Sequence, residues 1–208
     1  MQRSDLKEED YQHLLNRIVP ILLAKGLKST TMDTVATALG MSKRTLYEIF
    51  NSKSEMLKEV LGALERQNEK VYMSAFENSE NVMEALFVIF KYNRDLVGRI
   101  NVNFYRDMDR LYKDKRRTYD KTREGRHEKM LQLFRLGVDQ GMFRPDVDYG
   151  VQSRIMGLQM EGLKRIEELF PPDIPLQRVF DAIILGFLRS IASQKGMDVL
   201  NRLTHELN

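Results

Sequence analysis

The sequence predicts an all-α protein. Apolar residues recur at helical spacing along the whole chain of 208 residues, and only five prolines interrupt it. Neither the alternating pattern of strands nor Asn-Gly hairpin signals occur. Apolar side chains make up 42% of the residues, which is enough to bury a core and excludes a disordered or collagen-like chain.

The composition narrows the possible functions. The formal net charge is +3 and the pI about 9.0, so contact with nucleic acid would need a local basic patch. The chain has no cysteine, which removes disulfides, cysteine-zinc sites and thiol nucleophiles. The N-terminus has no secretory pattern, and the longest apolar runs, 19–24 and 85–90, are far shorter than the ~20 residues of a membrane helix. We therefore expect a soluble cytoplasmic protein with no membrane partner.

The first expected helix covers residues 5–25. Asp5 and Glu8 have the spacing of a helix-start box, and Gly26 fits the stop. Pro20 lies inside this segment and removes one backbone hydrogen bond, so we expect a kink there.

Two short helices follow. The segment 31–39 has Thr31 as its N-cap and ends at Gly40. The next segment, 42–50, begins with a second N-cap, Ser42. A single glycine turn therefore separates two short helices.

Longer helices fill the rest of the chain. Ser52 and Glu55 form a capping box that begins a helix running to about residue 75. Gly141 and the proline-rich link 171–175 mark later breaks. The remaining expected helices are 81–100, about 104–112, 119–140, 149–170, 176–193 and 197–207.

The residues 32–51 fit a helix-turn-helix unit. Ala36 is its fifth residue, where two helices cross closely, and Gly40 is its ninth, where the turn needs a positive φ. Apolar contacts that lock the helices are expected from Val35, Leu39, Met41, Leu46 and Ile49.

The segment 30–53 resembles the TetR/AcrR family of bacterial transcriptional regulators. It follows the family pattern T-T-x-x-x-I/V-A-x-x-x-G-V-S-x-x-x-L-Y-x-x-F-x-S-K. The segment 141–148 is similar to the family's G-x-F-R-x-D-x-D link. The resemblance implies a DNA-binding domain, residues 1–53, and a helical ligand-binding and dimerisation domain, residues 54–208.

The resemblance also assigns roles within the first domain. The segment 42–50 would be the recognition helix in the major groove, with Lys43, Arg44 and Thr45 facing the bases. Leu46 and Phe50 would be core residues. Contacts to bases or to phosphate are expected from Thr31, Ser42, Lys43, Arg44, Thr45, Tyr47, Glu48 and Lys53.

Two positions depart from the family pattern. Ile49 stands where the family often has His or an aromatic residue, which removes one possible backbone contact. Glu48 brings a negative charge near the DNA, and it either accepts from a cytosine amine or points away from the bases. These departures leave open an alternative, a helical small-molecule binding or buffering protein whose helix-turn-helix no longer reads DNA.

The second domain is expected to hold an effector and a partner subunit. Apolar and Met side chains, more often plain core than pocket, would enclose a small apolar or amphipathic molecule: Phe87, Phe90, Phe104, Tyr105, Met108, Tyr112, His127, Met130, Phe134, Met156 and Met160. The helices 149–170 and 176–193 resemble the family's four-helix dimer interface, through Met156, Phe180, Ile183, Ile184, Phe187, Leu188 and Ile191.

No catalytic or metal-binding constellation is visible in the sequence. There is no Ser-His-Asp, Cys-His or phosphate-loop arrangement, and His127 lacks the partners of a metal motif. We therefore expect no enzyme activity, metal or cofactor. The sequence predicts a homodimeric repressor that binds a palindromic double-stranded DNA operator and is released by a small-molecule effector.

Overall fold

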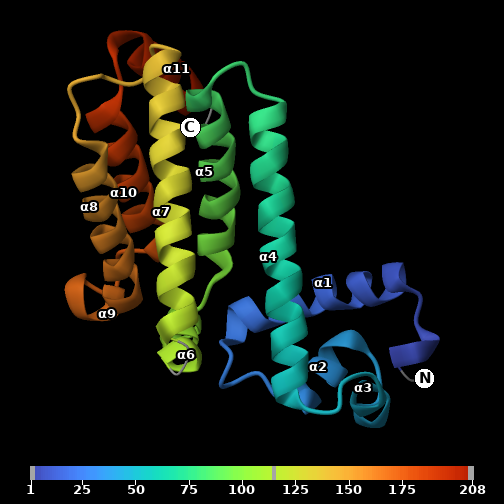
Figure 1. The fold of residues 1–208 in the computed structure, drawn as a ribbon. Helices are drawn as coiled ribbons and strands as arrows, with labels where there is room; N and C mark the ends of the chain where they lie inside the picture. The colour runs from blue at the N-terminus through green and yellow to red at the C-terminus, as the bar shows by residue number, and fades with distance from the viewer. Residues whose placement is uncertain (1–2, 114–115, 206–208) are drawn as a thin grey trace. The chain divides into compact units, whose positions relative to one another are not determined.

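The computed structural model describes residues 3–113 and 116–205, and every regular element within them is a helix (Figure 1). An isolated antiparallel bridge joins Phe143 to Ala192. The all-α prediction is confirmed. The chain divides into two compact units, Met1–Lys70 with Arg99–Leu111 and Val71–Gly98 with Tyr112–Asn208. This division falls within a helix, about 17 residues after the functional boundary expected at residue 53.

The first unit is built from short helices around one apolar centre. Its elements are the 3-10 turn η1 (Arg3–Asp5), α1 (Glu8–Lys25), α2 (Met32–Leu39), α3 (Lys43–Ile49), the first part of α4 (Lys53–Glu77) and most of α6 (Val102–Lys113). The apolar side chains of this unit with no more than 1% exposure are Leu15, Ile18, Leu22, Val35, Leu46, Phe50, Met56 and Val60. Leu46 and Phe50 are therefore core residues, as expected.

The start of α1 differs from the prediction. The helix begins at Glu8, and its N-cap, Lys7, makes no side-chain capping bond. The Glu8 carboxylate accepts from Arg3 (2.8 Å) and from Gln12 (2.7 Å), and Asp5 lies in the 3-10 turn before the helix and not at its N-cap. The chain stays helical through Pro20, and the kink expected there remains a prediction.

The end of α1 packs closely on the start of α6. The Asn101 N–H donates to the Leu23 carbonyl (2.8 Å), and the Lys28 N–H donates to the Asp107 carboxylate (2.7 Å). Between them Gly26 has φ +82°, and a Cβ there would lie 3.3 Å from the same carboxylate oxygen. These contacts hold the turn after α1 against α6 within the first unit.

The second unit is a helical bundle with an aromatic core. Its elements are α5 (Val82–Arg99), α7 (Arg116–Asp139), α8 (Tyr149–Gly162), the 3-10 turn η2 (Leu163–Arg165), α9 (Ile166–Leu169), α10 (Leu176–Ile191) and α11 (Gln194–His205). The ring of Phe134 stacks on Tyr149 (4.9 Å between centroids) and Phe90 stacks on Phe180 (5.9 Å). In Figure 1, α8 and α10 lie side by side at one side of the bundle, where they contact each other.

The segment 149–170 was expected as one helix, and this is wrong. The structure breaks it into α8, η2 and α9 after Gly162. Glycine favours helix continuation less than other residues. Leu163 and Ile166 are both buried (2% and 7% exposed), and a turn of three residues aligns side chains three positions apart.

None of the described helices is both long and apolar enough to cross a membrane.

Candidate nucleic-acid interface

The turn between α2 and α3 is held by local hydrogen bonds. The Thr31 hydroxyl accepts from the Thr34 N–H (3.1 Å) and caps the start of α2. At the other end Gly40 adopts φ +68°, and the Met41 N–H donates to the Ala36 carbonyl (3.0 Å). This is the left-handed helix cap for which glycine is favoured. The predicted N-cap and glycine turn are therefore confirmed.

The start of α3 is capped in the same way. The Ser42 hydroxyl accepts from the Thr45 N–H (3.0 Å) and also lies 2.8 Å from the Thr45 hydroxyl. On the inner face of the pair of helices, Ala36, Leu46 and Ile49 are no more than 4% exposed. The inner face is packed, and the starts of α2 and α3 are both capped. The outward face of α3 therefore has a fixed direction relative to α2.

The outward face of α3 carries cations and a tyrosine. The side chains of Lys43 and Arg44 are 54% and 88% exposed, and Tyr47 is 44% exposed. Arginine and lysine to guanine are the commonest base-specific contacts in the major groove, and a tyrosine hydroxyl can donate to a phosphate. This face has the side chains that a DNA-reading helix needs.

Both cations on α3 have acidic partners within the first unit. The Lys43 ammonium lies 2.9 Å from the carboxylate of Asp33 on α2, and this hydrogen bond raises the pKa of Lys43. The Arg44 guanidinium lies 3.1 Å from Glu48, one turn further along α3. Both readings of Glu48, as a base contact or as a residue that faces away, remain predictions.

Lys53, the first residue of α4, is anchored to the loop after α1. Its ammonium donates to the Lys28 carbonyl (2.8 Å). An ammonium has three donors, so two remain for a phosphate. The capping box expected here closes differently, because Glu55 accepts from the Asn51 N–H (3.0 Å) while its own N–H donates to Ser52 (3.1 Å).

The residues expected to line an effector pocket are spread over both units. Phe87, Phe90 and Phe134 are fully buried core residues of the second unit. Phe104, Tyr105 and Met108 belong to α6 in the first unit, where Phe104 is buried and the other two are half-buried. Met130, Met156 and Met160 are half-buried in the second unit, and the side chains of Tyr112 and His127 lie outside the described residues.

The residues expected at a dimer interface divide into two groups. Four of them are no more than 8% exposed and pack inside the second unit: Phe180, Phe187, Leu188 and Ile191. Met156, Ile183 and Ile184 are half-buried and lie nearer the surface.

A different set of apolar residues is exposed on α8. Val151, Ile155 and Leu158 are 51%, 43% and 69% exposed, and their spacing places them along one face of the helix. Sequence reasoning missed this stripe, although its helical spacing is visible in the sequence. Spacing alone cannot tell which of several apolar faces the fold leaves open.

Within the described residues, no group of three His, Cys, Asp or Glu side chains is placed to hold a metal ion.

Two short helices joined by a left-handed glycine turn, with cations on the outer face of the second, define a helix-turn-helix DNA-binding module. Residues 18–60 match the family described as "Bacterial regulatory proteins, tetR family". These residues therefore form a DNA-binding domain of the TetR type, and the family match together with the curated relatives supports a DNA-binding transcriptional regulator.

Relatives of known class extend over most of the chain. The HTH-type transcriptional repressor KstR2 of Mycobacterium tuberculosis is 27% identical over 147 residues, which cover 69% of this chain and 74% of that protein. The structure of the ketosteroid transcriptional regulator KstR2 from that organism matches with a TM-score of 0.59 at 21% identity, covering 91% of this chain and 98% of the other. A TetR-family regulator from Marinobacter aquaeolei matches with a TM-score of 0.66 at 17% identity, covering 97% and 98%. At these identities the solved structures support the fold alone.

Proposed function

We propose that this chain is a homodimeric transcriptional repressor that binds a palindromic operator and is released by a small apolar or amphipathic effector. The observation that carries the proposal is the capped and packed α2–α3 pair, with Lys43, Arg44 and Tyr47 on its outer face. A fixed recognition helix of this kind contacts the bases with the residues near its N-terminus. Such a protein acts where the DNA is, in the cytoplasm.

The exposed apolar stripe on α8 supports a homodimer. Val151, Ile155 and Leu158 would remain in water in a monomer, whereas a second copy of the same surface would bury them. A two-fold dimer places two recognition helices on half-sites about 34–36 Å apart or a related distance. This geometry matches a palindromic operator.

The proposed effector acts through a shift between two states. KstR2 is described as a ketosteroid transcriptional regulator, which supports an apolar or amphipathic molecule as the class of effector here. Binding among the helices of the second unit would favour a state in which α4 moves and the two recognition helices lose their spacing. A differential binding energy of about 1–3 kcal/mol is typical of such coupling.

The test is fluorescence anisotropy with labelled duplexes. The unaltered chain is titrated into DNA from upstream of its own gene and into a scrambled duplex, each at two salt concentrations. We expect tight binding to the first duplex only, weakening steeply with salt because phosphate contacts release counterions. Equal, weak binding to both duplexes would contradict the proposal and favour the helical binding or buffering protein whose helix-turn-helix no longer reads DNA.

Variants assign the contact to α3. Lys43→Ala and Arg44→Ala are expected to weaken operator binding by about 1–3 kcal/mol each where they touch a base, with relaxed specificity. Arg135→Ala on α7 removes one exposed positive charge from the second unit and is the matched control. If both α3 variants bind the operator as the control does, the assignment of the reading residues is wrong.

A further inference from the structure

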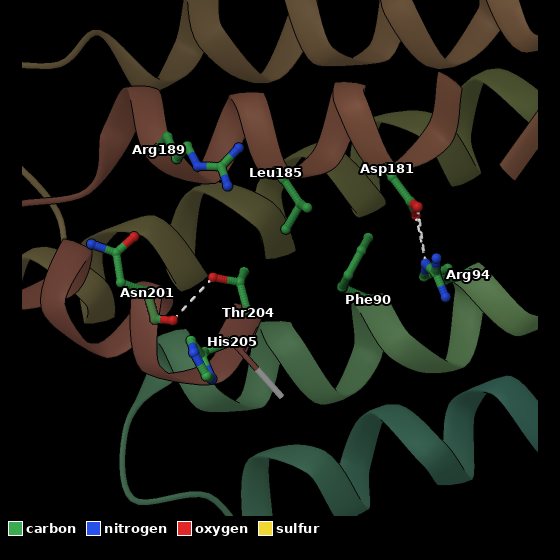
Figure 2. A pocket seen from close by; sticks show the side chains of 8 residues that line it. All are labelled: Phe90, Arg94, Asp181, Leu185, Arg189, Asn201, Thr204 and His205. Atoms are coloured by element: carbon green, nitrogen blue, oxygen red, sulfur yellow. Dashed lines mark hydrogen bonds and ion pairs between the residues drawn. The ribbon is translucent and has the colours of Figure 1, made fainter. Parts of the chain in front are cut away.

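A cavity of about 360 Å³ lies between α5, α10 and α11 in the second unit. Its size falls at the lower end of the range of small-molecule sites. Only one of the residues considered for the effector, Phe90, takes part in it. The side chains around it differ in character from one end to the other (Figure 2).

One end of the cavity is electrically balanced. The Arg94 Nε lies 2.9 Å from both carboxylate oxygens of Asp181, so the two charges cancel locally. Two of the cavity's three formally charged side chains therefore contribute no net charge.

The other end gathers donors from two helices. Arg189 of α10 and Asn201, Thr204 and His205 of α11 line that end (Figure 2). Within the described part of the chain, the Arg189 guanidinium has no hydrogen-bond or ion-pair partner. A guanidinium binds a carboxylate through two parallel hydrogen bonds. This end is therefore suited to an organic anion.

An apolar middle separates the two ends. Leu185 and Phe90 lie between them in Figure 2. On α10 the residues Asp181, Leu185 and Arg189 follow each other at intervals of four, so the stripe spans about 12 Å of helix at 1.5 Å per residue. A ligand that follows this stripe needs an apolar body behind its anionic group.

We propose that this cavity binds a small organic monocarboxylate with an apolar body. The carboxylate pairs with Arg189, and the apolar body lies along Leu185 and Phe90. The site is separate from the operator-binding surface, and its occupation is measured without DNA. Failure of the site therefore leaves the proposed repressor function untouched, and the reverse also holds.

The test is calorimetric titration of the full chain with octanoate and with octanamide, which has the same apolar body without the charge. We expect octanoate to bind at least about tenfold more tightly than octanamide, because the guanidinium-carboxylate pair is charge-assisted. Absence of octanoate binding, or equal binding of both compounds, would overturn the proposal.

Variants locate the binding. Arg189→Gln is expected to weaken octanoate binding by at least about tenfold and to leave octanamide unchanged. Arg178→Gln, an exposed arginine on the same helix outside the cavity, is the control and is expected to bind as the unaltered chain does. Arg189→Lys keeps the charge and is expected to lose less, which preserves the test if the glutamine variant fails to fold. If all three variants bind octanoate equally well, Arg189 does not hold the carboxylate and the proposed site is wrong.

Discussion

The ammonium of Lys43, the first residue of α3, lies 2.9 Å from the carboxylate of Asp33 at the start of α2. Both side chains are more than half exposed, so water screens the pair and its own contribution to stability is small. The pair matters for DNA binding, because Lys43 has to leave Asp33 before it can contact a base.

Replacing Asp33 is therefore expected to strengthen DNA binding. Asp33→Asn removes a negative charge beside the DNA-facing surface and frees Lys43. We expect a two- to fivefold gain in affinity at low salt, roughly the free energy of one exposed ion pair. The gain should appear for the operator and for the scrambled duplex alike. The slope of log affinity against log salt concentration should become steeper by up to about one, the amount expected for one phosphate contact. Anisotropy titrations at several salt concentrations measure both quantities.

Asp139→Asn on α7 is the matched control, since it removes an exposed carboxylate from the second unit. It is expected to leave both affinities unchanged. An Asp33→Asn variant that binds DNA no better than the control would show that the ion pair does not restrain Lys43.

A side chain at position 40 is expected to destabilise the protein through the backbone conformation alone. A Cβ there meets nothing within 4 Å, but φ is +68°. A left-handed conformation costs other residues about 1–2 kcal/mol, so Gly40→Ala should lower the free energy of unfolding by that amount. Urea titration followed by circular dichroism measures it.

Gly62→Ala is the control, because it replaces a glycine with alanine at a position that has no positive φ. Gly62 lies inside α4 in helical conformation, and its added Cβ would meet only the end of the flexible Arg66 side chain (3.3 Å). We expect a gain of about 0.5–1 kcal/mol, because alanine favours a helix interior over glycine. Equal losses in the two variants would contradict the role assigned to the turn at Gly40.

The local features of the DNA-binding unit were predictable from the sequence because their causes lie within a few residues. Thr31, Ser42 and Gly40 act through hydrogen bonds and φ values inside one turn of chain. Burial of Leu46 and Phe50 also followed, since the helix-turn-helix pattern places both on the inner face. Capping chemistry and helical spacing are enough for these predictions.

Features that depend on packing between distant segments were not predictable. The break of 149–170 depends on how Leu163 and Ile166 reach the core. The contact of Lys53 with the Lys28 carbonyl joins residues 25 positions apart. An apolar residue on a helix is compatible with either core or surface, so the exposure of Leu158 and the burial of Phe180 could not be separated by spacing.

Tyr149 predicts a pH dependence of stability. Its hydroxyl donates to the Arg144 carbonyl (2.6 Å), and burial raises its pKa above 10.0. The folded chain therefore holds this proton more firmly than the unfolded chain. The stabilisation that the Tyr149 hydroxyl gives to the folded chain is complete below about pH 10. It is lost as the pH rises through the higher pKa that Tyr149 has in the folded chain. Tyr149→Phe should cost about 0.5–1.5 kcal/mol at pH 8, and the difference from the unaltered chain should shrink at alkaline pH.

Urea titrations at pH 8 and at pH 11 measure the two differences. Tyr47→Phe, which removes an exposed hydroxyl, controls for the loss of a phenol group. A Tyr149→Phe penalty that stays constant between the two pH values would mean that the proton on Tyr149 is not held more firmly in the folded chain.

The exposed stripe on α8 predicts a variant that separates folding from association. Leu158 is 69% exposed, so Leu158→Glu removes no core contact, but in a two-fold dimer it would bury two carboxylates against apolar side chains. We expect the dimer dissociation constant to rise by at least about thirtyfold, the 2 kcal/mol typical of a residue central to an interface. Sedimentation equilibrium measures the constant, and circular dichroism confirms the helix content.

Leu136→Glu on α7 is the control, because it places the same charge at an exposed leucine outside α8 and α10. It should sediment as the unaltered chain does. Operator affinity adds a second readout, since two linked half-site contacts bind far more tightly than one: Leu158→Glu should lose operator affinity at low protein concentration while Leu136→Glu keeps it. If Leu158→Glu remains a dimer, another surface must form the interface, and if the unaltered chain is a monomer, the two-fold arrangement of the recognition helices fails with it.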